Sequence, residues 1–287
     1  MELKAKVIFA DSRRLSELLP QSSVDLVLAG PPYWNDVVYS NDKEQLSKFE
    51  DYESFLREIS KVWESSSKVL KNGSILAIWV HDLIRKMDNG YKYIPLHSDI
   101  LKTIPSDLIL RNMYIWDRYL NKDKGKIENN SFGSRIQYIL IFQKNGVGKN
   151  QDKIERSLTR LFWQPVWYKK TTPKFMGSSL FFRILFSLSK LTFGYGQRIT
   201  NWLSRYKILK DKYKFKSYIT ECPEDVSDLL IKLFSSMGDT VLDPFAGSGT
   251  TLKSALKQNR NAIGIEINKG CREVIKMKLN GRVIFDL

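Results

Sequence analysis

Short apolar runs that alternate with helical segments limit the folds open to this chain more than any other feature of its sequence. DLVLAG (25–30), SILAIWV (74–80) and NAIGIEIN (261–268) have the length and the β-branched content of buried strands. FEDYESFLREISKVWESSSKVLKNG (49–73) and CPEDVSDLLIKLF (222–234) instead repeat apolar residues at helical spacing. Strands that alternate with helices form a mostly parallel sheet covered on both faces. The sequence therefore predicts an α/β fold.

Other segments extend the same pattern. We expect strands at 7–10, 113–119, 135–144 and 282–287, a helix at 270–280, and a strand, a glycine-rich turn and a helix in succession over 240–251. Gly73 is placed to end the first long helix as a C-cap, and Pro223 stands near the start of the second.

Charge separates one segment from the rest of the chain. Residues 145–216 contain 16 lysines and arginines against three acidic residues, a net charge of +13, while the remainder carries 30 basic and 28 acidic residues. Such a segment is typical of a surface that binds a polyanion, because neutralising phosphates releases counterions. A solvated lysine-rich surface is the alternative. Aromatic residues interleaved with the charges favour the polyanion: Trp163, Trp167, Tyr168, Trp202, Tyr206 and Tyr213.

Composition excludes several other classes of protein. An apolar fraction of 43% in 287 residues predicts a folded globular chain. With two cysteines and two histidines, we expect neither a disulfide scaffold nor a metal site. The N-terminal MELKAKVIFADSRRL lacks the apolar run of a secretory signal, and SSLFFRILFSLSKLTF (178–193) is too short to span a bilayer. We expect a cytoplasmic protein that does not enter a membrane.

The segment VLDPFAGSGTT has the features of a ligand-binding turn. In sheets of this kind, ligands bind beyond the carboxyl ends of the strands. Gly247 and Gly249 allow close approach of the backbone, and Glu266 ends a strand 17 residues after Gly249, where a carboxylate suits ribose hydroxyls. No lysine follows Gly249, as a phosphate-binding loop would require, and Leu252 replaces the third glycine of a dinucleotide motif. A nucleoside ligand without a pyrophosphate remains.

A second strand, in VDLVLAGPPYWND, ends with residues that an interior strand does not use. Proline cannot donate to a sheet, so Pro31 and Pro32 must lie beyond the end of the strand. Tyr33 and Trp34 follow them. By itself this segment is more typical of a proline-rich turn in which the two aromatic rings cover the core.

Together the two segments resemble a known enzyme family. DPFAGSGTT is similar to the S-adenosylmethionine-binding motif of amino-group DNA methyltransferases, and GPPYW resembles their catalytic motif, usually Ser, Asp or Asn followed by Pro-Pro-Tyr or Phe. The catalytic motif precedes the cofactor motif, as in the circularly permuted β group of these enzymes. The resemblance implies a Rossmann-like S-adenosylmethionine-dependent methyltransferase fold. Residues 1–144 and 217–287 would form the catalytic domain, and 145–216 an inserted target-recognition region that binds double-stranded DNA.

The resemblance also implies roles for single residues. Asp243 would lie near the methionine ammonium of the cofactor and Glu266 would hold its ribose. Asp11 is a candidate for the adenine edge, and a helix N-cap is its alternative role. Thr220 and Pro223 match the segment that closes over the methionine end. The expected cofactor contacts are Asp11, Thr220, Pro223, Asp243, Pro244, Phe245, Ala246, Gly247, Ser248, Gly249, Thr250 and Glu266.

The catalytic motif suits the chemistry of an exocyclic amine, whose lone pair is delocalised into the base. The Pro31 carbonyl would accept an amino hydrogen and turn the nitrogen toward the methyl group, while Tyr33 would stack on a flipped base. The expected catalytic residues are Gly30, Pro31, Pro32, Tyr33 and Trp34. The expected DNA contacts are Lys169, Lys170, Lys174, Arg198, Arg205, Lys210, Lys212 and Lys214.

One residue departs from the family pattern. Gly30 stands where the family carries a side-chain acceptor, so one expected hydrogen bond to the amine is missing; Asn35, Asp36 or a water are substitutes. Tyr33-Trp34 and Tyr39 resemble the cytosine-N4 form of the motif, and glycine is closer to serine than to aspartate in size and charge. We therefore predict cytosine N4 as the methylated atom, with adenine N6 as the alternative.

Two further function classes stay open at this point. One is a catalytically inactive DNA-binding homologue, and the other is a nicotinamide-dependent oxidoreductase that uses a similar glycine turn. For the active enzyme, we expect a monomer or homodimer, with a cognate restriction endonuclease as a candidate partner.

Overall fold

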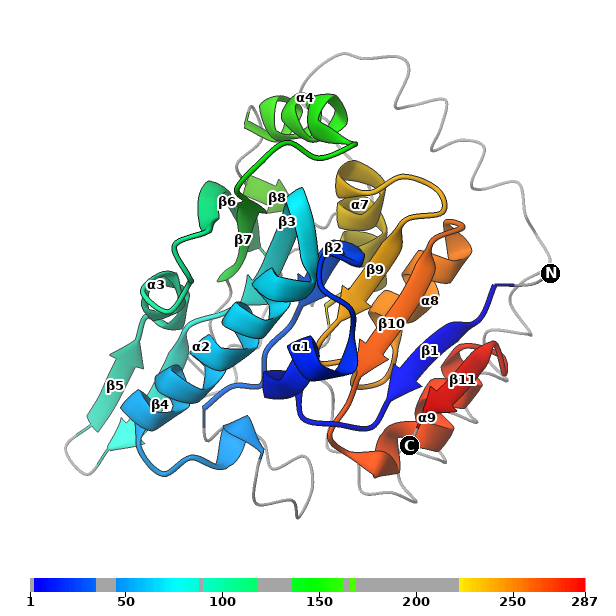
Figure 1. The fold of residues 1–287 in the computed structure, drawn as a ribbon. Coiled ribbons are helices and arrows are strands. Elements are labelled where there is room, and N and C mark those ends of the chain that lie inside the picture. The colour runs from blue at the N-terminus through cyan, green and yellow to red at the C-terminus, as the bar shows by residue number, and fades with distance from the viewer. Residues whose placement is uncertain are drawn as a thin grey trace.

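A twisted nine-stranded sheet forms the centre of the computed structural model, which describes residues 3–34, 45–87, 90–117, 136–162, 166–168 and 222–286. The strand order is β11-β1-β10-β9-β2-β3-β7-β6-β8 (Figure 1). The first six strands in this order run parallel, and β7 is antiparallel to both of its neighbours. The strands are β1 (Ala5–Ile8), β2 (Val24–Ala29), β3 (Leu70–Val80), β6 (Leu108–Asp117), β7 (Ile136–Lys144), β8 (Val166–Tyr168), β9 (Thr240–Asp243), β10 (Asn261–Ile265) and β11 (Val283–Asp286).

Helices cover both faces of this sheet (Figure 1). One face carries α1 (Leu15–Leu18), α2 (Tyr52–Val69) and α3 (Leu96–Leu101), and the other carries α4 (Gln151–Phe162), α7 (Glu224–Phe234), α8 (Thr250–Lys257) and α9 (Arg272–Lys278). Short 3-10 helices lie at Ser12–Arg14 (η1), Leu46–Lys48 (η2) and Lys269–Cys271 (η4). A separate hairpin pairs β4 (Leu83–Met87) with β5 (Gly90–Ile94). The predicted α/β fold with a mostly parallel sheet is confirmed.

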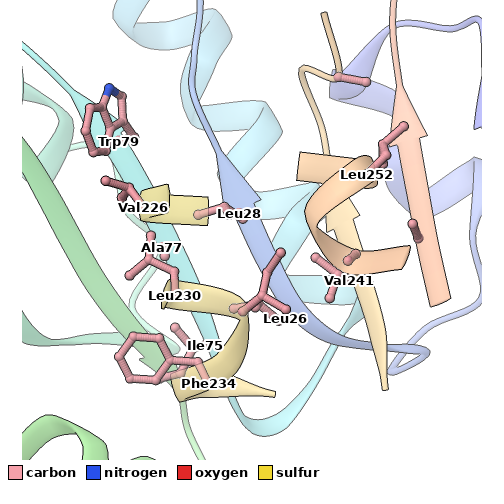
Figure 2. Packing of buried hydrophobic residues seen from close by; sticks show 14 of the residues in the cluster. Leu26, Leu28, Ile75, Ala77, Trp79, Val226, Leu230, Phe234, Val241 and Leu252 are labelled. Carbon is pink, nitrogen blue, oxygen red and sulfur yellow. The ribbon is translucent and has the colours of Figure 1, made fainter. Parts of the chain in front are cut away.

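Strand β2 shows why the sheet needs both layers of helices. Leu26 and Leu28 pack toward α7 and α8, as Figure 2 shows, whereas Val27 and Ala29 pack toward α2 on the opposite face. All six residues of the strand are buried. A strand that is apolar on both faces cannot border solvent, so it occupies the middle of the sheet.

The predicted C-cap at Gly73 is wrong. Helix α2 ends at Val69, and the chain enters β3 at Leu70 without an intervening turn. Gly73 lies inside β3 with φ of +72°, and a Cβ there would approach the backbone nitrogen of Gly148 to 2.2 Å. The glycine is required by this close backbone contact and not by the end of the helix.

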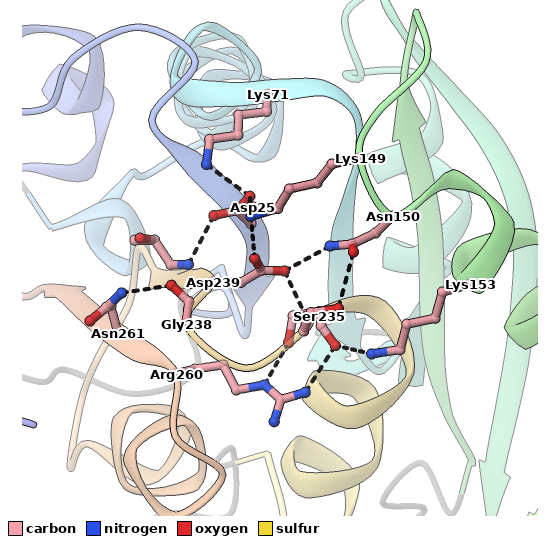
Figure 3. A network of polar contacts seen from close by, with 12 residues as sticks. Asp25, Lys71, Lys149, Asn150, Lys153, Ser235, Gly238, Asp239, Arg260 and Asn261 are labelled. Atoms are coloured by element: carbon pink, nitrogen blue, oxygen red, sulfur yellow. Dashed lines mark hydrogen bonds and ion pairs between the residues drawn. The ribbon is translucent and has the colours of Figure 1, made fainter.

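A polar network joins several elements at the amino-terminal edge of the strands (Figure 3). Asp25 accepts from Lys71 Nζ at 2.8 Å and from the backbone N–H of Thr240 at 3.0 Å. Asp239 pairs with Lys149 at 2.5 Å and accepts from Asn150 at 2.7 Å. Burial alone would raise the pKa of Asp25. Lys71, the Thr240 N–H and Lys149 outweigh the burial and hold that pKa below its ordinary value. The network ties β2, β3 and β9 to the segment that leads into α4.

Candidate functional site

One cavity lies at the carboxyl ends of β2 and β9, which are neighbours in the sheet. Gly30 and Pro32 line it from the end of β2, and the residues from Asp243 to Ser248 line it from the end of β9. The two motifs are more than 200 residues apart in the sequence, and the parallel pairing of their strands places them around one space. The remaining wall consists of Asp11, Ser12, Leu28, Ala29, Gln45, Leu46, Ser47, Trp79, Cys222, Thr250, Thr251, Ile265, Glu266, Ile267, Asn268 and Cys271.

The glycine-rich turn has the backbone geometry that its sequence predicts. Gly247 and Gly249 have φ of +52° and +87°, and Gly249 is the N-cap residue of α8. The backbone N–H of Ala246 donates to the carbonyl of Ile265 at 2.9 Å, which fastens the turn to the end of β10. The turn is therefore held open toward the cavity by backbone conformations that favour glycine.

Two carboxylates lie in the cavity wall, of which Asp243 is buried and Glu266 is partly buried. Asp243 is 5% exposed and accepts from the backbone N–H of Phe245 at 2.9 Å. Glu266 accepts from the backbone N–H groups of Gly247 and Asn268, both at 2.8 Å. Burial raises the pKa of Asp243 to about 6 and that of Glu266 to about 7, and the neighbouring charge of Asp243 adds to the shift of Glu266.

No lysine or arginine among the described residues forms an ion pair with either carboxylate. Each carboxylate still has lone pairs that no described donor uses. A ligand with a cationic group and hydroxyl donors would supply both kinds of partner. The residues present therefore fit the ammonium and the ribose of an amino-acid nucleoside such as S-adenosylmethionine.

Residues of the Gly-Pro-Pro segment differ in their access to the cavity. Gly30 lines it, its φ is not positive, and a Cβ built there has no atom within 4 Å. Pro32 also lines the cavity, whereas Pro31 is buried outside the lining. The position that lacks the family's side chain thus has open space for one.

Tyr33 and Trp34 do not line the cavity. Tyr33 is 1% exposed, and its ring lies 4.0 Å from that of His81. Trp34 donates from Nε1 to the Phe49 carbonyl at 2.8 Å, and its own carbonyl accepts from Arg85 at 2.6 Å. Tyr33 is thus buried and Trp34 partly buried, and the stacking of Tyr33 on a base stays a prediction.

The other predicted cofactor contacts are only partly brought together. Asp11 lines the cavity, and it is also the N-cap of η1, because its side chain accepts from the backbone N–H of Arg13 at 2.9 Å. Pro223 is the N-cap residue of α7 and lies outside the lining, although its neighbour Cys222 belongs to it. Thr220 lies outside the described residues.

Two anchoring residues were not predicted from the sequence. Lys278, in α9, is 7% exposed and donates to the hydroxyls of Ser248 and Thr250 in the glycine-rich turn. Ser12 donates to the Pro244 carbonyl on the opposite side of the same turn. A lysine on the apolar face of α9 is the one signal that could have indicated the first of these contacts.

The predicted DNA contacts, from Lys169 to Lys214, lie outside the described residues, as do Asn35, Asp36 and Tyr39. Within the described part of the chain, no group of three or more His, Cys, Asp or Glu residues is arranged to hold a metal ion. None of the helices described is long and apolar enough to cross a bilayer.

Comparisons with known proteins agree with the geometry. The N6/N4 methyltransferase family model, described as DNA methylase, matches residues 24–277. The type II methyltransferase M.MjaI of Methanocaldococcus jannaschii is 28% identical over 307 residues, which cover 96% of this chain and 90% of that protein.

Two solved structures share the fold over nearly the whole chain. The putative DNA modification methylase TTHA0409 of Thermus thermophilus, crystallised with S-adenosyl-L-methionine, has a TM-score of 0.62 at 25% identity, covering 98% of this chain and 99% of its own. The PvuII cytosine-N4-specific DNA methyltransferase has a TM-score of 0.60 at 15% identity, covering 99% of this chain and 98% of its own.

Proposed function

Because this chain belongs to the N6/N4 DNA methylase family, we propose that it transfers a methyl group to the exocyclic N4 amine of cytosine in double-stranded DNA. Membership makes it a DNA amino-methyltransferase and sets aside the nicotinamide-dependent oxidoreductase. One observation carries the proposal: the ends of β2 and β9 place the Gly-Pro-Pro segment and the glycine-rich turn around a single cavity.

S-adenosylmethionine, the methyl donor of this family, supplies an electrophilic methyl group when bound. In our proposal, Asp243 binds its ammonium group and Glu266 binds its ribose hydroxyls. Both carboxylates lie in the cavity wall without an ion pair to any described cation, and both would be ionised in the complex. The glycine-rich turn holds the methionine part through its backbone, and Asp11 lies at the adenine edge.

The Gly-Pro-Pro segment would orient the target amine. Pro31 lies outside the lining, but its neighbours Gly30 and Pro32 line the cavity, and in this proposal the Pro31 carbonyl accepts one amino hydrogen. The fixed φ of two successive prolines would keep that carbonyl in place. A base that reaches this position must leave the duplex stack, because the reacting nitrogen is otherwise enclosed by its neighbours. In this proposal the rate comes mainly from alignment of the nitrogen with the methyl carbon.

The choice of base rests on the residues around Gly30. Tyr33-Trp34 and Tyr39 resemble the cytosine-N4 form of the motif, and Gly30 is neutral as serine is. Adenine N6 is the alternative, supported by a 75-residue match, 45% identical, to the DNA adenine methyltransferase YhdJ of Escherichia coli. That match covers 26% of this chain, so it carries less weight than the catalytic motif itself.

Residues 145–216 are proposed to be the target-recognition region between the two parts of the catalytic domain, 1–144 and 217–287. Their net charge of +13 supports a role in binding phosphates, with Lys169, Lys170, Lys174, Arg198, Arg205, Lys210, Lys212 and Lys214 as the proposed contacts. Relatives such as M.MjaI are type II methyltransferases, which supports a role in restriction and modification beside a cognate endonuclease.

A methyl-transfer assay tests the proposal. The purified protein is incubated with isotopically labelled S-adenosylmethionine and mixed-sequence DNA, the DNA is digested to nucleosides, and these are identified by mass spectrometry. We expect N4-methylcytosine. N6-methyladenine as the sole product would overturn the base assignment, and the absence of any methylated nucleoside would favour a catalytically inactive DNA-binding homologue.

A further inference from the structure

The cavity wall contains a serine whose hydroxyl has no partner among the residues that the structure describes. Ser47, in η2, is 2% exposed and lines the cavity beside the residues of both motifs. Its Oγ is buried and makes no hydrogen bond to any described residue. A buried hydroxyl without a partner lowers stability, because it has lost its bonds to water without gaining a replacement. A ligand that satisfied this hydroxyl would recover that cost.

The same wall lacks a polar side chain at Gly30, where the family carries an acceptor for the target amine. A Cβ at Gly30 would have no atom within 4 Å, so no described side chain fills the place of the missing one. The open position and the unpartnered hydroxyl therefore belong to one cavity.

Two side-chain groups of this wall lack a described hydrogen-bond partner, and only one of them can accept a hydrogen from an amine. Apart from Ser47 Oγ, the indole Nε1 of Trp79 is also buried there without a hydrogen-bond partner among the described residues. Indole N–H is a donor only, so it cannot accept a hydrogen from an amino group. A serine hydroxyl can accept, and rotation about a single bond, Cα–Cβ, redirects it.

We propose that Ser47 accepts a hydrogen bond from the target amine and so replaces the side chain that is absent at Gly30. This inference rests on the proposed function. During transfer the amine nitrogen forms a bond to the methyl carbon, the bond from that carbon to sulfur breaks with both electrons remaining on sulfur, and the surplus amine proton passes to solvent. Ser47 exchanges no proton in this step, and it orients the nitrogen together with the Pro31 carbonyl.

Four proteins test the role of Ser47: the wild type, Ser47→Ala, Gly30→Ser and the double variant. Single-turnover methyl transfer is measured with each at saturating S-adenosylmethionine and DNA, and cofactor Kd is measured by calorimetry. Ser47→Ala should slow transfer about 5- to 30-fold, the value of one neutral hydrogen bond, and leave the cofactor Kd within about twofold. In the Ser47→Ala background, Gly30→Ser should restore the rate to within about threefold of wild type, because it returns an acceptor to the family position.

Ser66→Ala is the matched control, because Ser66 Oγ in α2 is also buried without a partner among the described residues but does not line the cavity. Its rate should equal that of wild type. An unchanged rate for Ser47→Ala, a loss confined to cofactor affinity, or a loss that Gly30→Ser does not restore would each overturn the role of Ser47 while the methyltransferase function stands. A wild-type protein that methylates no DNA would overturn both.

Discussion

At the scale of single residues, the buried carboxylate of Asp243 couples ligand binding to stability. The pKa of Asp243 is raised from 3.8 to about 6, so the native state holds this proton more tightly than the unfolded chain does. The contribution of Asp243 to the stability of the ligand-free protein should therefore fall as pH rises from about 4 to about 6, and stay lower at higher pH. The negative charge of Asp243, which would bind the cofactor, therefore destabilises the protein when no cofactor is bound.

Replacing Asp243 should separate these two effects. Asp243→Ala should weaken S-adenosylmethionine binding about 10-fold or more, because it removes a charge-assisted bond of about 1.5 to 3 kcal/mol. Asp243→Asn should do the same while stabilising the ligand-free protein at pH 8 by about 1 to 3 kcal/mol, with little change at pH 4. Calorimetry and urea unfolding measure the two quantities. Unchanged affinity in a folded variant would remove Asp243 from the cofactor site.

Gly30 offers a second prediction for a single residue. Its backbone angles and the open space around it accommodate serine, so Gly30→Ser should fold normally and transfer methyl groups at the wild-type rate or faster. Gly249→Ser is the contrasting variant, because φ of +87° strains any residue with a side chain. It should lower the midpoint of thermal unfolding, whereas Gly30→Ser should leave it within about 2 °C. A fall in both midpoints would contradict this account.

At the scale of elements, helix α9 positions the glycine-rich turn through Lys278. Lys278→Met keeps the length of the side chain but removes the donor to Ser248 and Thr250. We expect S-adenosylmethionine to bind about 3- to 10-fold more weakly, since the turn loses an anchoring hydrogen bond. Lys276→Met, at an exposed site on the same helix, should bind it normally. Equal affinities, measured by calorimetry, would show that the turn holds its shape without this lysine.

The basic segment carries a prediction about DNA. Neutralising Lys210, Lys212, Lys214 and Lys216 together should weaken DNA binding and reduce the dependence of log K on log salt by up to about 4, because fewer counterions are released. Cofactor affinity should not change. Fluorescence anisotropy at several salt concentrations measures the slope. A slope identical to wild type would identify these lysines as a solvated surface.

How well each element could be predicted follows from how it is stabilised. Strands β2 and β9 and the turn after β9 were predictable, because burial on both faces and the demand for glycine leave direct marks in the sequence. The role of Gly73 was not, because this glycine is required by close contact with the backbone of Gly148, far away in the chain. The β4–β5 hairpin was not predicted from the sequence.

The candidate site divides in the same way. Carboxylates and glycines that follow strands could be identified from their spacing. The buried state of Tyr33 could not, because its partner His81 follows a different strand. Ser47 and Lys278 reach the cavity region from elements whose sequences carry no motif, so only the three-dimensional arrangement reveals them.

At the scale of the whole molecule, the polar network at the amino-terminal edge of the sheet ties β2, β3 and β9 to the segment that leads into α4. Asp239→Ala removes the acceptor of Lys149 and Asn150 and of the Ser236 N–H, so it should destabilise the protein by about 1 to 3 kcal/mol. Lys6→Ala breaks an exposed pair with Asp286 and should cost about 1 kcal/mol or less. Urea unfolding compares them. A smaller loss for Asp239→Ala than for Lys6→Ala would show that the network contributes no more than a surface pair.

This network also has a consequence for inheritance. Asp25 and Asp239 share Lys149. A lineage that loses one of the acids leaves the other with surplus positive charge, and a lineage that loses Lys149 leaves two buried acids with less compensating charge. Replacement of the whole set by apolar residues is tolerated far better than replacement of one member. Positions 25, 71, 149 and 239 should therefore covary among descendants of a common ancestor, changing together or not at all. Reconstructed ancestors that carry a mixed set should be rare, and when made they should be less stable than either parent.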